Sequence, residues 1–181
     1  MNKRLVKQIL ENPFGRLWTV QGFGKMAANI SADSRLHIWD RVLVNPEVPA
    51  IHSHASDFRS VVLVGCMRNL RFIEVEQDHP LGKSFNKILS SNPEHATHAF
   101  LCELPIEVYG EDAQYKQSAE EVHWSFPDDG TVTLVEWAFG SSSLPMKVYW
   151  RGRFPWQDAK PRQATEDEVI KVTHRALALW F

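Results

Sequence analysis

From residue 17 onward the chain alternates short runs rich in Val, Ile, Phe and Trp with turn residues, and this rhythm restricts the fold more than any other feature. Gly22, Gly24, Asn45-Pro46 and Pro49 mark the first turns. Short β-prone runs at this spacing are typical of an all-β sandwich or barrel. The clearest expected strands are residues 35–44, 58–64, 70–75, 122–126, 131–139 and 147–151.

Both ends of the chain have helical rather than strand periodicity. Apolar residues recur at helical spacing over residues 3–11, which predicts a short leading helix. Thr165 stands three residues before Glu168, a capping-box pattern, and apolar residues then recur at helical spacing. We therefore expect an amphipathic terminal helix over about residues 165–180, packed on the sheet or against a second subunit.

Two connecting segments have their own signals. Asp128-Asp129-Gly130 predicts a tight hairpin turn between the strands at 122–126 and 131–139, because glycine tolerates positive φ. Residues 77–111 are less regular, with Pro, Ser, Asn and His scattered through them. We interpret this segment as an insertion with a short helix near residues 85–89.

Composition and charge restrict the class of protein. With 181 residues, 44% hydrophobic and 23% charged, and no repeat or linker, the chain is expected to form a single domain over residues 1–181, with a barrel core of about 17–156. The net charge of -2 provides no basic field, so neither nucleic acid nor a membrane is expected as a partner. The absence of a signal-peptide pattern and of a long apolar run predicts a cytoplasmic location.

The segment from Ile51 to Arg59 contains the most informative motif, His52-Ser53-His54. Side chains at i and i+2 of a strand leave the same face, so the two imidazoles would point together. Such a pair can take adjacent positions around one metal ion, although an exposed polar pair at a sheet edge has the same pattern. A third ligand would have to come from elsewhere, and His123, which opens the expected strand at 122–126, is the best candidate.

These residues resemble the first and second motifs of the cupin superfamily. The first motif is similar to His52-Ser53-His54 followed by Asp57, with Gly65 as the turn after the next strand, and the histidine of the second motif is matched by His123. The likeness covers residues 35–139 and is closest to the cysteine-dioxygenase-like branch of three-histidine metal cupins. It implies a jelly-roll barrel (double-stranded β-helix), Fe(II) bound by the three histidines, oxygen chemistry at that iron, and a homodimer.

Three further residues are candidates for the site. Asp57 stands where many cupins have a glutamate ligand, so it is either a fourth metal ligand or a residue that caps a turn or pairs with Arg59. Arg59 either faces the barrel mouth and binds a substrate carboxylate or lies in solvent, because strand alternation alone does not fix its direction. Tyr115 either lines the pocket as a hydrogen-bond donor or packs in the core. Residues 137–143 lack the downstream tyrosine of thiol dioxygenases, so cysteine is not the expected substrate.

Two functional hypotheses follow from these residues. The first is a mononuclear non-heme iron oxygenase, dioxygenase-like, that acts on a small organic molecule. The second is a non-oxidative cupin, either a small-molecule binding protein or an isomerase or hydrolase that uses Zn, Mn or Ni as a Lewis acid. The barrel alone does not choose between them, because one fold hosts many functions.

Overall fold

The computed structural model of the chain describes residues 3–45, 48, 50–138, 144–152 and 161–180. Its strands form two sheets, and within each sheet all paired strands are antiparallel. The first sheet has the order β10 (Gln114–Gln117), β5 (Phe58–Val64), β12 (Val132–Trp137), β3 (Ser34–Val44), β2 (Phe23–Asn29), β1 (Trp18–Gln21) and β14 (Arg162–Gln163). We call it sheet 1.

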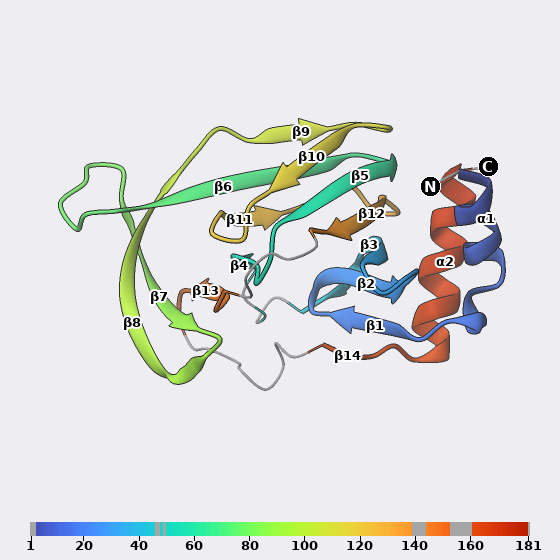
Figure 1. Ribbon diagram of the computed structural model, residues 1–181, viewed down its shortest axis with the longest axis horizontal. Coiled ribbons are helices and arrows are strands. Elements are labelled where there is room, and N and C mark those ends of the chain that lie inside the picture. The colour runs from blue at the N-terminus through green and yellow to red at the C-terminus, as the bar shows by residue number, and fades with distance from the viewer. Residues whose placement is uncertain (1–2, 46–47, 49, 139–143, 153–160, 181) are drawn as a thin grey trace.

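The second sheet, sheet 2, has the order β11 (Val122–Ser125), β4 (Ile51–His52), β13 (Lys147–Trp150), β7 (Lys83–Leu89), β8 (Asn92–Glu103), β6 (Met67–Val75) and β9 (Glu107–Tyr109). Because β11 also pairs with β6, the strands from β11 to β6 form a closed ring. Figure 1 shows β7, β8 and one end of β6 on the side of the molecule away from the helices. The predicted all-β jelly-roll barrel with short flanking helices is confirmed.

The two helices lie together at one end of sheet 1 (Figure 1). Helix α1 (Lys3–Glu11) has the predicted bounds, and α2 (Glu166–Trp180) begins at the predicted capping box. There the Glu168 N–H donates to the Thr165 hydroxyl over 3.2 Å, and the Thr165 N–H donates to the Glu168 carboxylate over 2.9 Å. A short 3₁₀ turn, Pro13–Gly15, connects α1 to β1. None of the described helices is long and apolar enough to cross a membrane.

Sheet 1 buries two faces of different character. Its apolar face packs on the two helices. Residues of the sheet and of both helices form one buried cluster there, which includes Val6, Leu10, Met26, Leu36, Ile38, Val169 and Val172. Alternate residues of β1, β2 and β3 point the other way and line a cavity between the sheets. Along β2, Met26 and Ala28 therefore belong to the helix side, whereas Lys25 and Ala27 belong to the cavity side.

Two local predictions are wrong. Residues 85–89 are not helical but belong to β7, and residues 77–111 supply β7, β8 and β9 of sheet 2. The turn at Asp128-Asp129-Gly130 exists, with Gly130 at φ 75°, but it does not form a hairpin. β11 pairs with β4 and β6, whereas β12 pairs with β3 and β5, so the turn carries the chain from sheet 2 to sheet 1.

The six expected strands correspond to β3, β5, β6, β11, β12 and β13 with small changes at their ends. Gly65, expected as the turn after β5, has φ 82°, and an added Cβ would lie 2.9 Å from the Thr131 Cα atom. The predicted strand end at Phe139 and the predicted core boundary at residue 156 lie outside the described residues.

Candidate metal centre

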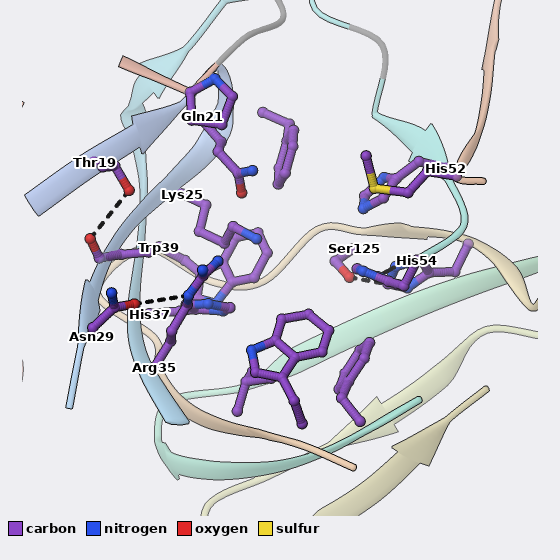
Figure 2. A pocket seen from close by; sticks show the side chains of 18 of the residues that line it. Thr19, Gln21, Lys25, Asn29, Arg35, His37, Trp39, His52, His54 and Ser125 are labelled. Atoms are coloured by element: carbon purple, nitrogen blue, oxygen red, sulfur yellow. Dashed lines mark hydrogen bonds between the residues drawn. The ribbon is translucent and has the colours of Figure 1, made fainter. Parts of the chain in front are cut away.

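The three predicted histidines come together at one wall of the cavity (Figure 2 labels His52 and His54). His52 is the last residue of β4 and pairs in register with His123 of β11. Ser53, between the first two histidines, is buried and bonded to Lys147 of β13, both through its N–H and through its hydroxyl, which accepts from the Lys147 N–H. Because Ser53 points toward β13, its two neighbours turn their rings to the other side.

The geometry of the three imidazoles fits one metal ion. Their ring centroids are 4.9, 5.0 and 5.1 Å apart, and one nitrogen from each ring lies within 4.8 Å of the others. The Nε2 atoms of His54 and His123 are 2.9 Å apart. Two nitrogens bound to one metal at 2.0–2.1 Å and at a right angle would lie roughly 2.9 Å apart. The cluster can therefore hold a divalent metal ion.

Hydrogen bonds select the ring nitrogen that two of the histidines offer. The Nδ1 atom of His52 lies 2.9 Å from the Ala50 carbonyl oxygen, which can only accept. The Ser125 hydroxyl donates to the Asn69 side-chain oxygen over 2.7 Å and lies 3.4 Å from Nδ1 of His123, so it is placed to accept from that ring. Both contacts put the proton on Nδ1 and leave the Nε2 lone pair free, as a metal ligand requires.

The surroundings keep all three imidazoles neutral. Burial lowers the pKa of His52 to about 4, and it lowers the pKa values of His54 and His123 well below the ordinary value of 6.5. The charge of Lys25 adds to this effect at each ring. Neutral histidines bind metal without first losing a proton, so the site is ready for metal at neutral pH.

Asp57 is not part of the histidine cluster. Its side chain is exposed, and Oδ1 accepts the Ala119 N–H over 2.7 Å. Ala119 in turn accepts the His54 N–H at its carbonyl oxygen over 3.1 Å. The structure thus places Asp57 where it fixes the loop that holds the backbone of His54, as in the capping alternative, and brings together the three histidines without Asp57.

Arg59 and Tyr115 lie on neighbouring strands of sheet 1, and their side chains point to opposite faces of that sheet. Arg59 is exposed on β5 and donates to the Glu136 carboxylate over 2.6 Å on the outer face, so it is not brought to the cavity. Tyr115 is buried on β10, lines the cavity and stacks on Tyr109 with centroids 4.6 Å apart. Burial raises the pKa of the Tyr115 phenol, which therefore keeps its proton.

The cavity has a volume of about 800 Å³ and lies between the two sheets. Aromatic rings form much of its wall: Phe23, Trp39, Phe58, Tyr115 and Trp137. Polar side chains of β1, β2 and β3 lie opposite the histidines, as Figure 2 shows for Thr19, Gln21, Lys25, Asn29, Arg35 and His37. This polar side was not predicted from the sequence. The available signal was the alternation in β1 and β2, but its polar half is the pattern of a solvent-exposed face.

No protein-family model matches the sequence, and no curated protein matches it. The geometry of the histidines and of the cavity beside them is therefore the basis for assigning a function.

Proposed function

We propose that the protein is a metal-dependent cupin of the three-histidine kind, a mononuclear non-heme iron oxygenase that acts on a small organic molecule. The observation that carries the proposal is the cluster of three neutral imidazoles in the wall of a cavity of about 800 Å³ between two antiparallel sheets. Cavities of this volume enclose small organic ligands.

A catalytic role explains the arrangement better than a structural one. Structural metal sites are usually closed by four protein ligands, whereas catalytic sites keep positions open for water or substrate. Three protein ligands beside a cavity leave such positions on the cavity side. Ferrous iron held by His52, His54 and His123 would supply a redox-active centre at which dioxygen and substrate can react.

The residues around the cluster orient the imidazoles and exclude water. Phe58 packs edge-on against His54 with centroids 4.7 Å apart, and Phe23 lies 5.3 Å from the His52 ring. The Ala50 carbonyl holds the His52 ring, and the Ser125 hydroxyl the His123 ring, in the tautomer with the proton on Nδ1. Tyr115 lines the cavity and keeps its phenol proton, and its hydrogen bonding with Ser60 and Asn69 holds the ring in the wall of the cavity.

Metal content decides whether the site exists and which chemistry it supports. We expect near-stoichiometric iron in protein purified without an affinity tag, measured by mass spectrometry, and its loss in His52→Ala/His123→Ala. The matched control is His95→Ala/His98→Ala, which removes two exposed histidines of β8. Retention of the metal in His52→Ala/His123→Ala would show that the histidines are structural.

The open positions can be tested without knowing the substrate. Nitric oxide added anaerobically to the Fe(II)-loaded protein should give the EPR signal of nitric oxide bound to ferrous iron. Zn, Mn or Ni at the site of the native protein would instead favour a Lewis-acid isomerase or hydrolase, and no metal after reconstitution with each ion would favour a binding protein. The proposal includes a homodimer, for which light scattering should give twice the 20.8 kDa of one chain, and a single-chain mass would exclude it.

A further inference from the structure

The cavity is more basic than the protein as a whole. Arg16, Lys25 and Arg35 line it, and among the described residues that line it none is acidic. The 181 residues together nevertheless carry a net charge of -2. A cavity with basic side chains and no carboxylate attracts an anion, because the charges it contains have no internal counter-charge.

Lys25 is the deepest of these cations. It is 9% exposed, its Nζ lies 5.0 Å from the Phe23 ring centroid and 5.6 Å from that of Trp39, and it has no carboxylate partner among the described residues. Burial lowers the pKa of Lys25 to about 7, since the charged ammonium loses its hydration. A buried lysine without a counter-ion is costly to a fold, and a bound anion would remove that cost.

Arg35 lies nearer to solvent on the same inner face. β2 and β3 pair Asn29 with Arg35, and the Arg35 Nε–H donates to the Asn29 side-chain oxygen over 2.9 Å. Arg35 is exposed, this bond and the contact with the Trp137 ring orient its guanidinium, and it forms no ion pair with any described residue. A fixed guanidinium with free N–H groups is suited to a carboxylate, which it can bind through two oxygens.

Two aromatic rings connect the cations to the histidines. Phe23 lies beside Lys25 and 5.3 Å from the His52 ring, and Trp137 lies 6.0 Å from both the Arg35 guanidinium and the His54 ring. Figure 2 shows Lys25 and Arg35 on one side of the pocket and His52 and His54 on the other. A molecule with one aromatic ring and a short acidic chain can therefore reach both sides at once.

We propose that the cavity binds an organic acid, with its carboxylate held by Lys25 and Arg35 and its apolar body between the aromatic rings, facing the three histidines. Chemistry on this acid rests on the proposed metal-dependent function. Binding of the acid does not, because neither cation belongs to the histidine cluster.

The test compares an acid with its uncharged isostere on the metal-free protein. We expect 3-phenylpropionate to bind at least about tenfold more tightly than 3-phenylpropionamide, by calorimetry or by the fluorescence of the cavity tryptophans. Lys25→Met/Arg35→Met should remove that preference. Lys116→Met/Arg59→Met is the matched control, since it removes the same two side-chain types from the exposed outer face, where Lys116 and Arg59 pair across β10 and β5.

The two proposals can fail separately. His52→Ala/His123→Ala should keep the preference for the acid, so a failure of the metal assignment would leave this result in place. Equal affinity for acid and amide, no binding of the acid, or a preference that survives Lys25→Met/Arg35→Met would overturn the acid site. Competition by inorganic phosphate as strong as that by 3-phenylpropionate would show a general anion site and overturn the apolar part of the proposal.

Discussion

At the scale of single residues, the backbone around His54 decides how well the imidazole cluster is held. His52 and His123 are fixed by strand pairing and by bonds to Nδ1, whereas His54 lies beyond the end of β4. Its main-chain support is the Ala119 carbonyl, and the loop that carries Ala119 is held by the Asp57 carboxylate. Asp57 therefore acts on the site through the position of another residue.

This role separates two substitutions at Asp57. Asp57→Asn keeps a side-chain oxygen that can accept the Ala119 N–H, so metal affinity should stay within about threefold of the wild type. Asp57→Ala removes the acceptor and should weaken metal binding by about tenfold, as loss of a partner outside the ligand set often does. Competition with a chromophoric chelator measures both. A loss of affinity in Asp57→Asn as large as in Asp57→Ala would contradict the capping role.

Lys25 should make stability depend on pH. Its folded pKa of about 7 lies below the ordinary value of 10.5, so between these values the unfolded chain binds the extra proton and stability rises with pH. Lys25→Met should therefore be more stable than the wild type below pH 7, with a difference that shrinks as the pH rises. Urea unfolding at about pH 6, 8 and 10 tests this, with Lys116→Met as the exposed control. Parallel profiles for wild type and Lys25→Met would contradict it.

The sequence predicted the histidines better than the rest of the cavity for a physical reason. A His-x-His pair indicates a possible metal site from its residue types and spacing alone. The pattern around Lys25 and Arg35, in contrast, is the same whether these side chains face solvent or a cavity. Their direction depends on which face of sheet 1 the helices cover, and Arg59 was left undecided by the same ambiguity. Only the packing of distant segments resolves it.

At the scale of elements, β7 shows how a register shift can make a strand look like a helix in the sequence. Its buried residues are Phe85 and Ile88, three apart, because the register with β8 shifts between Lys87 and Leu89. A bulge of this kind breaks the alternation of a strand and produces a spacing that is typical of a helix. The β3, β5 and β12 pairings also contain register shifts, but the runs of β-branched and aromatic residues in these strands still predict strands. Both helices keep the helical spacing of their apolar residues and were predicted correctly.

The turn that carries the chain from β11 to β12 is expected to require glycine at position 130. Gly130 has φ 75°, and an added Cβ would collide with the Leu179 side chain of α2. Gly130→Ala should lower the free energy of unfolding by about 1–3 kcal/mol, mainly through backbone strain at positive φ and also because the Leu179 side chain must move aside. Gly110→Ala is the control, because nothing lies within 4 Å of the position of its Cβ. Equal denaturation midpoints for the two variants would contradict this reading.

At the scale of the whole molecule, metal binding should stabilise the barrel. The proposed ligands come from β4, the residues that follow it, and β11, whose pairings with β4 and β6 close the ring of sheet 2. Zn²⁺ at about 100 times its dissociation constant should add roughly 2.7 kcal/mol, provided that the unfolded chain does not bind it. Calorimetry should show a higher Tm with Zn²⁺ in the wild type and in His95→Ala/His98→Ala, but not in His52→Ala/His123→Ala. An equal rise in all three would place the metal elsewhere.

The two faces of sheet 1 have separate duties, because Met26, Leu36 and Ile38 pack on the helices while Lys25, Arg35 and His37 line the cavity. Selection for stability and selection for a ligand therefore act on alternate residues of the same strands. A lineage of such chains can exchange cavity residues, and with them its substrate, while the packing under the helices stays as it is. Because of this arrangement, the cavity side of sheet 1 can change its ligand preference while the packing that stabilises the protein is kept.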